Sequence, residues 1–254
     1  MLSVAHRGYS AAYPENTALA FERAIEAGAE FIETDVRFTR DGALACSHDA
    51  DLTRIAGDGR AIAELTLGEV QAIALPRGQK LLAVEDVLAI ARGRAQVMLD
   101  VKVSTPEMAK AIVAALERTR MTGNVIYGAR TVGHVLDVTR CTSRVAILGM
   151  PANPGLVPEF LAHPVRALRY WEEDVTPERF AEIVDAGREV WVTAGLRPRQ
   201  EAPGYITAAR AGALAAMGVH AVLVNDPTVV HPSTVPRQGR DAASEEKLSL
   251  RGTP

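Results

Sequence analysis

Two carboxylates two residues apart interrupt an otherwise apolar stretch. Glu33 and Asp35 lie within the segment Phe31–Val36, which has the composition of a buried β-strand. Successive side chains of a strand alternate between its two faces, so both acids share one face. Asp100 and Lys102 repeat this pattern further along the chain. The sequence therefore predicts acidic side chains in a place where a strand is normally apolar.

Acids buried in this way need compensating positive charge, because removing a carboxylate from water costs several kcal/mol. A divalent cation held by Glu33, Asp35 and Asp100 would supply it. All-oxygen ligands without a cysteine or a tight histidine cluster favour Mg²⁺ or Ca²⁺ over zinc. The alternative is a buried ion-pair network of Glu33 and Asp35 with two basic residues, Lys102 and Arg7, and spacing alone leaves both interpretations open.

Two histidines could supply proton transfer. His6 ends the first short apolar segment and is followed by Arg7, whereas His48 is followed by Asp49. Imidazoles titrate near neutrality and act as general acids and bases, although a lone histidine is more often structural. With a metal as Lewis acid and with Arg7 and Lys102 as phosphate-binding cations, the set would meet the requirements of phosphoryl chemistry.

The elements that position these residues alternate along the chain as strand and helix, the pattern of parallel strands joined by crossover helices. The predicted strands are Leu2–Ala5, Phe31–Val36, Gln96–Val101, Asn124–Tyr127, Arg144–Leu148, Arg166–Arg169, Glu189–Thr193 and Ala221–Val224. The predicted helices between them include Ala18–Ala27, Pro106–Arg118, Val132–Thr139, Pro177–Ala186 and Ile206–Met217. Eight such units favour a (β/α)₈ TIM barrel over a doubly wound sheet.

One insertion interrupts the alternation after the second strand, at about residues 43–80. It comprises a short strand at Ala43–Ser47, a polar loop through Gly59 and a helix near Leu67–Ile73. We expect a single barrel domain over residues 1–232 and a flexible C-terminal tail over residues 233–254, which has few apolar anchors.

Composition restricts the class of protein. The 254 residues are 48% hydrophobic and 23% charged, with a net charge of -3, and the pI is near 6.1. Nucleic-acid and membrane-surface partners need clustered basic residues, so neither is expected. Cys46 and Cys141 lack metal-binding or redox spacing, which predicts buried or half-buried thiols. With no apolar stretch of the roughly 20 residues that span a bilayer and no signal peptide, we expect a cytoplasmic protein. No signal for an oligomeric state is present.

The order and spacing of these motifs resemble the glycerophosphodiester phosphodiesterase family. The N-terminal motifs that carry the resemblance are Ala5–Gly8, Pro14–Thr17, Glu33–Val36, Asp41–Gly42 and His48–Asp49. It continues through Leu52–Arg54, Gly57–Gly59, Leu65–Glu69, Val84–Leu88 and Asp100–Lys102. It is dense over the first hundred residues and then thins to Trp191–Thr193 and Asn225–Pro227.

The resemblance implies a (β/α)₈ barrel that hydrolyses small glycerophosphodiesters to glycerol 3-phosphate and an alcohol such as choline or ethanolamine. Carried over by position, it makes His6 and His48 the general acid and base, and Arg7 and Lys102 the phosphate contacts. It assigns one divalent cation, Mg²⁺ or Ca²⁺, to Glu33, Asp35 and Asp100. It also suggests Glu85 and Trp191 as substrate-pocket residues, although Glu85 could simply begin a helix and Trp191 could pack in the core.

The chain departs from the family pattern in two places. Asp100 stands where the family usually has a glutamate, which is one methylene longer. After Trp191 the chain reads Val192-Thr193-Ala194 instead of Thr-Val-Asn, so a polar contact to the headgroup is expected to be missing. Tyr170 and Trp171 lie near a strand end, where a cation–π contact to choline is conceivable.

Two other functions remain open at this point. A lysophospholipase D or sphingomyelinase D type activity would use a similar barrel, but the low basic content and the absence of a membrane-binding helix disfavour a lipid interface. A non-catalytic phosphate-binding barrel would account for the altered acid at Asp100 and the weakened C-terminal motifs.

Overall fold

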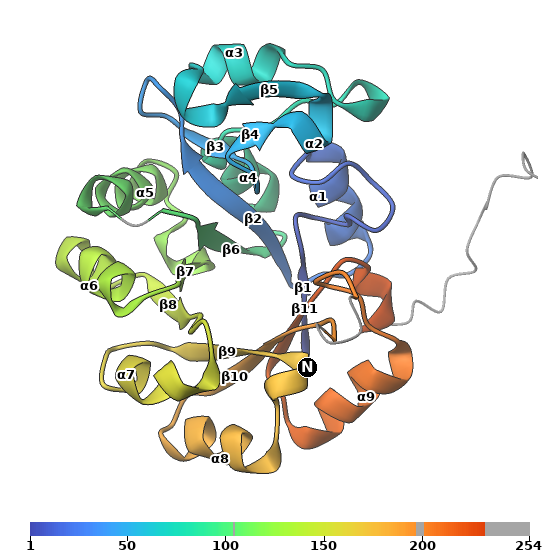
Figure 1. Cartoon of the computed structure of the whole chain (residues 1–254), viewed down its shortest axis with the longest axis vertical. Coiled ribbons are helices and arrows are strands. Elements are labelled where there is room, and N and C mark those ends of the chain that lie inside the picture. The colour runs from blue at the N-terminus through green and yellow to red at the C-terminus, as the bar shows by residue number, and fades with distance from the viewer. Residues whose placement is uncertain (104, 197–200, 232–254) are drawn as a thin grey trace, which may run out of the picture.

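A closed ring of eight parallel strands forms the centre of the computed structural model, which describes residues 1–103, 105–196 and 201–231. Pairing of the first strand with both the last and the second closes the ring (Figure 1). Its strands are β1 (Leu2–Ala5), β2 (Phe31–Phe38), β6 (Gln96–Val101), β7 (Val125–Ala129), β8 (Ala146–Gly149), β9 (Ala167–Trp171), β10 (Glu189–Thr193) and β11 (Ala221–Val224). The predicted (β/α)₈ barrel is confirmed. The predicted tail at residues 233–254 lies outside the described residues.

Helices surround the ring on its outer side (Figure 1). They are α1 (Ala18–Glu26), α4 (Val84–Ala91), α5 (Pro106–Arg118), α6 (Val132–Cys141), α7 (Val157–Leu161), α8 (Pro177–Asp185) and α9 (Ala208–Met217). A threonine caps the start of five of them, with its hydroxyl accepting a backbone N–H of the first turn: Thr17, Thr105, Thr131, Thr176 and Thr207. The cap at Thr207 explains why α9 begins at Ala208 and not at the predicted Ile206.

Side-chain alternation along the strands separates two apolar layers. Val4, Phe31 and Met98 belong to a cluster inside the barrel, whereas their neighbours Ala5, Ile32 and Leu99 pack against the helices. Each strand therefore presents every second residue to the barrel interior. Further along the strands, the same inward face carries the charged residues of the site.

The insertion after β2 is a small unit with its own apolar cluster, which includes Leu52, Ile62 and Val70. Its elements are β3 (Leu44–Cys46), β4 (Asp51–Leu52), α2 (Thr53–Ala56), β5 (Asp58–Ala61) and α3 (Leu67–Ala72). β3 pairs antiparallel with β2, and β4 pairs antiparallel with β5. The prediction of a plain loop through Gly59 was wrong, because that stretch folds back on itself as the β4–β5 pair.

Three strands are longer than predicted, since β2 extends to Phe38, β7 to Ala129 and β9 to Trp171. Cys46 is buried and Cys141 half-buried, and both are free thiols as expected. Among the helices of the described ranges, none combines the length and the apolar character needed to cross a bilayer.

Candidate active site

A cavity of about 100 Å³ opens at the carboxyl ends of the barrel strands. Six of the residues singled out from the sequence line it: His6, Arg7, Glu33, His48, Asp100 and Lys102. They come from three neighbouring strand ends and from the insertion, so the fold brings together side chains that are up to 96 positions apart in the chain (from 6 to 102).

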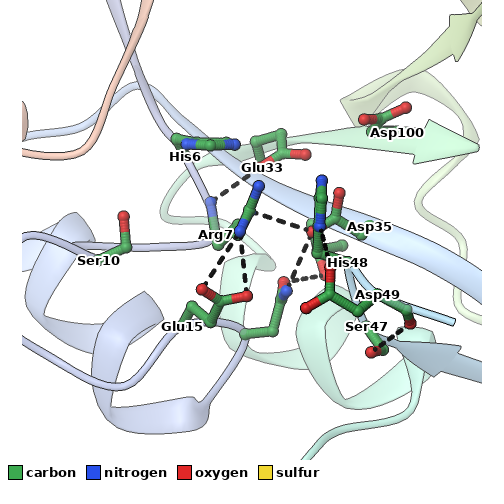
Figure 2. Close-up of polar contacts among 12 residues, drawn as sticks. His6, Arg7, Ser10, Glu15, Glu33, Asp35, Ser47, His48, Asp49 and Asp100 are labelled. Atoms are coloured by element: carbon green, nitrogen blue, oxygen red, sulfur yellow. Dashed lines mark hydrogen bonds and ion pairs between the residues drawn. The ribbon is translucent and has the colours of Figure 1, made fainter. Parts of the chain in front are cut away.

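The three predicted acids form one buried cluster. One carboxylate oxygen each of Glu33, Asp35 and Asp100 lies within 4.8 Å of the others. Asp35 and Asp100 are register partners on the adjacent strands β2 and β6. Glu33 precedes Asp35 by two residues on the same face of β2, as Figure 2 shows. The prediction that Glu33 and Asp35 lie on one face of the strand is therefore confirmed.

Basic side chains contact two of these acids. Lys102 Nζ lies 2.7 Å from Asp35 Oδ1 and 2.6 Å from Asp100 Oδ2. Arg7 Nε lies 3.4 Å from Asp35 Oδ2. Arg130, which follows β7, holds Asp100 in a two-pronged contact, with Nε 2.8 Å from Oδ1 and Nη2 2.5 Å from Oδ2. Part of the ion-pair network considered from the sequence therefore exists, with an additional arginine.

Glu33 is the acid of the cluster whose negative charge is least balanced by the basic side chains of this network. Its Oε2 accepts a hydrogen bond from the backbone N–H of Arg7 at 2.8 Å. Burial, followed by the nearby carboxylates of Asp35 and Asp100, raises the pKa of Glu33 well above its usual range. Burial also opposes ionisation of Asp100, but Arg130 and Lys102 outweigh it and lower the pKa of Asp100. An oxygen cluster with one poorly compensated acid fits a hard divalent cation.

Two residues that contact Asp35 have an unusual backbone conformation. Arg7 and Asn16 adopt left-handed φ values of 57° and 56°, which non-glycine residues rarely do. Asn16 Nδ2 donates to Asp35 Oδ2 at 3.1 Å, and its Oδ1 accepts from Thr34 Oγ1 at 2.8 Å. The stretch that from sequence merely capped the first helix therefore also orients the central acid of the cluster.

His6 is held by an amide. Its Nδ1 lies 2.7 Å from Asn225 Oδ1, and Asn225 Nδ2 donates to the carbonyl oxygen of Pro203 at 2.9 Å. This arrangement assigns the proton of neutral His6 to Nδ1 and leaves Nε2 as an acceptor. Burial, followed by the charge of Arg7, lowers the pKa of His6 to about 4. His6 is therefore neutral at pH 7.

His48 is held by the carboxylate of the next residue, Asp49 (Figure 2), and further charged contacts extend from there. Its Nδ1 lies 2.7 Å from Asp49 Oδ1, and Asp49 Oδ2 lies 2.6 Å from Arg54 Nε. Arg54 also donates to both carboxylate oxygens of Glu15, at 2.8 and 2.7 Å. Glu15 in turn pairs with Arg7 at 3.1 Å. These contacts connect the insertion to the loop that follows β1.

Two of the predicted pocket residues lie elsewhere. Glu85 is in the first turn of α4 and pairs with Arg118 of α5 at 2.7 Å, so it has the helix-start position considered for it. Trp191 is 3% exposed and packs edge-on against Phe31 inside the barrel, with ring centroids 5.0 Å apart. Neither lines the pocket. Trp171 lines it instead.

Arg130, Arg169 and Asn225 are site residues that the sequence reasoning did not assign. Arg130 and Arg169 line the pocket, and Asn225 holds His6 from the position just after β11. Alternation would have identified Arg169, because it follows the inward-facing Ala167 of β9 by two residues.

Comparison with known proteins fits this geometry. The model of the glycerophosphoryl diester phosphodiesterase family matches residues 6–143, more than half of the 254 residues. The chain belongs to this family. The matched range includes both histidines and all three acids of the site.

Individual family members differ in how much of the chain they match. Probable glycerophosphodiester phosphodiesterase 1 of Mycobacterium tuberculosis is 46% identical over 68 residues, which is 27% of this chain and 25% of that protein. The match thus spans about a quarter of that relative's length. Probable glycerophosphodiester phosphodiesterase 2 of the same species is 29% identical over 235 residues, covering 91% of this chain and 82% of that protein.

A solved structure with the same fold is an Oleispira antarctica phosphodiesterase in complex with the product sn-glycerol-3-phosphate. It superimposes with a TM-score of 0.80 at 18% identity and covers 91% of this chain and 96% of the other.

Proposed function

We propose that this protein is a metal-dependent phosphodiesterase that hydrolyses glycerophosphodiesters to glycerol 3-phosphate and an alcohol. The observation that carries the proposal is the meeting of two histidines and three buried acids at one cavity at the carboxyl ends of the barrel strands. The activity named for its relatives, and the product bound by the Oleispira antarctica enzyme, support it.

Glu33, Asp35 and Asp100 would hold one divalent cation, Mg²⁺ or Ca²⁺, through carboxylate oxygens. Bound there, the ion supplies Lewis-acid polarisation of a phosphate oxygen and offsets the mutual repulsion of the three acids. Burial first, and the charges of Asp35 and Asp100 second, raise the pKa of Glu33, and a bound cation would offset both effects.

Arg7 and Lys102 bind the phosphate in this proposal. Both line the cavity, and both are anchored by Asp35. A phosphodiester is an anion that repels an incoming nucleophile, so neutralising its charge lowers the barrier to attack. The anchoring contacts hold the two cations in place before substrate arrives.

The partners of the histidines suggest how the acid and base roles divide. His6 Nε2, unprotonated at pH 7, takes a proton from the attacking hydroxyl as its oxygen bonds to phosphorus. His48, whose Nδ1 contacts the Asp49 carboxylate, gives a proton to the departing alkoxide oxygen as its bond to phosphorus breaks. The attacking hydroxyl is that of water or of the glycerol at its 2-position.

Release of glycerol 3-phosphate from glycerophosphocholine is the direct test. We expect a chelator to abolish release and added Mg²⁺ or Ca²⁺ to restore it. We expect His6→Ala and His48→Ala each to reduce turnover by about 10²- to 10⁴-fold with an unchanged circular dichroism spectrum. Activity that is indifferent to chelator would contradict the metal assignment.

Two further outcomes would replace the proposal. Preference for lysophosphatidylcholine over glycerophosphocholine would indicate a lysophospholipase D type activity. Tight binding of glycerol 3-phosphate, without turnover of any diester, would indicate a non-catalytic phosphate-binding barrel.

A further inference from the structure

The wall of the cavity farthest from the acids is built by β9. In the ring of eight strands, β6, β7 and β8 separate β2 from β9 in one direction, and β1, β11 and β10 separate them in the other. The inward face of β9 runs from Ala167 through Arg169 to Trp171. A substrate whose phosphate lies beside Glu33 and whose other end crosses the cavity would meet Arg169 and Trp171 there.

Trp171 offers the aromatic surface on this wall, but the chain itself already covers one of its faces. The guanidinium carbon of Arg169 lies 4.6 Å from the centroid of the Trp171 ring. This is the position in which a quaternary ammonium group such as choline would gain a cation–π contact. The guanidinium therefore competes with a cationic headgroup for the ring and repels it by charge.

The other basic side chains that line the cavity add to its positive charge. Among the described residues that line it, four are basic and two are carboxylates, and the basic ones are Arg7, Lys102, Arg130 and Arg169. Arg7 and Lys102 lie beside the acid cluster, whereas Arg169 is 8% exposed and lies on the opposite wall. A largely desolvated guanidinium stacked on an indole is a rigid recognition group for carboxylate or phosphate.

We propose that Arg169, stacked on Trp171, selects glycerophosphodiesters that carry a second anionic group, a carboxylate or a phosphomonoester, away from the scissile phosphate. This inference rests on the proposed function and refines its substrate class. It assigns Arg169 a role in specificity and leaves the bond-breaking steps to the opposite side of the cavity.

Two pairs of substrates that each differ by one anionic group test the proposal. Glycerophosphoserine differs from glycerophosphoethanolamine by one carboxylate, and glycerophosphoinositol 4-phosphate differs from glycerophosphoinositol by one phosphomonoester. We expect kcat/KM to favour the anionic member of at least one pair by about tenfold or more, mainly through KM. The pair that shows the preference identifies which anion is recognised.

Variants of Arg169 test whether this residue causes the preference for the anionic substrate. Arg169→Gln should bring the ratio of kcat/KM values close to one by raising KM for the anionic member, and Arg169→Lys should retain part of the preference. Arg144→Gln is the matched control, because Arg144 is a surface arginine, paired with Glu117 and 69% exposed. Its ratio should equal that of the unmodified protein.

The outcomes separate this inference from the proposed function. If the unmodified protein hydrolyses all four diesters with ratios at or below one, the inference is overturned and the phosphodiesterase activity stands. A preference that persists in Arg169→Gln also overturns it. If none of the four is hydrolysed, the proposed function itself fails. The ratio measured on the unmodified protein decides the matter even if Arg169→Gln does not fold.

Discussion

The two histidines of the site differ in the chemical nature of the group that holds Nδ1. An amide oxygen of Asn225 holds His6, and a carboxylate of Asp49 holds His48. A neutral amide oxygen fixes the tautomer of the ring, whereas a carboxylate places a full negative charge beside it. In the proposed function, this difference supports His6 as the proton acceptor and His48 as the proton donor.

A first prediction concerns the protonation of His6. In the metal-free protein, an NMR titration should give a pKa for His6 near 4, because burial and Arg7 disfavour the imidazolium. The folded-state pKa lies below the unfolded value of 6.5, so the unfolded state binds the proton more readily. The free energy of unfolding should therefore decrease as the pH falls from 6.5 toward 4, by at most roughly 3 kcal/mol.

Comparison with His6→Asn isolates this contribution. Chemical denaturation at pH 7 and pH 4.5 should show a smaller loss of stability in the variant than in the unmodified protein. A titration midpoint for His6 at or above 6 would contradict the assignment of this ring as a neutral base.

A second prediction concerns Asp49, which acts through His48 and is a positioning residue. We expect Asp49→Asn to reduce kcat by about ten- to a hundredfold, less than His48→Ala, because the ring remains but loses its charged partner. A diester with a p-nitrophenolate leaving group needs no proton at departure. Its turnover should be nearly normal in Asp49→Asn, and an equal loss on both substrates would show that Asp49 merely maintains structure.

At the scale of elements, the site depends on how the insertion is attached to the barrel. Arg54 of α2 joins Asp49 to Glu15 across the boundary between the insertion and the loop after β1. The guanidinium of Arg37 on β2 donates to the backbone oxygen of His48 at 3.1 and 2.6 Å. Because these are charge-assisted contacts with defined geometry, they fix His48 in direction as well as in position.

A third prediction tests this attachment. Arg54→Ala should lower kcat by about tenfold or more with little change in melting temperature, since its side chain is 49% exposed and exposed ion pairs add little stability. Arg60→Ala is the control within the same insertion, because among the described residues Arg60 pairs with the nearby Asp58 and not with a residue of the candidate site. Equal activity losses in the two variants would show that the Arg54 contacts do not orient His48.

The barrel elements were predictable because their strands are short, apolar and regularly separated by helices. The acid cluster was predictable because charges at two-residue spacing stand out in an apolar strand. What could not be predicted is how deep in the barrel each inward-facing side chain lies, that is, whether it reaches the cavity or packs below it. Glu189, Trp191 and Thr193 share the inward face of β10, but Thr193 reaches the cavity while Trp191 lies below it. Only the register between neighbouring strands determines this level.

The register between β6 and β7 also explains why the role of Arg130 was not predicted. Arg130 follows the end of β7, and it reaches Asp100 because Gly128 of β7 is the register partner of Asp100. A β-carbon at Gly128 would lie 2.9 Å from the carbonyl oxygen of Leu99, so glycine permits the close approach of the two strands. These contacts join residues 30 positions apart and leave no periodic signal in the sequence.

At the scale of the whole molecule, Glu33 is the member of the acid cluster whose burial opposes folding in the absence of metal. A fourth prediction follows for Glu33→Gln. Removing the least compensated charge should raise the melting temperature of the metal-free protein, because burial and neighbouring acids disfavour an ionised Glu33. A bound cation stabilises only the folded state, so adding Mg²⁺ or Ca²⁺ should raise the melting temperature of the unmodified protein more than that of the variant.

Differential scanning calorimetry with and without metal measures both predicted changes in melting temperature. Glu85→Gln is the control, since Glu85 pairs with Arg118 on the surface. A metal-induced rise of equal size in Glu33→Gln and Glu85→Gln would contradict the ligand assignment of Glu33.

His48 belongs to a unit whose apolar cluster is separate from those of the barrel. The two histidines of the proposed acid–base pair therefore lie in different parts of the fold, His6 after β1 of the barrel and His48 in the insertion. If the smaller unit opened alone, the barrel would keep Arg7, Lys102 and the acids in place and still retain a phosphate. In the proposed function, phosphate binding therefore depends on the barrel alone, whereas turnover requires the insertion as well.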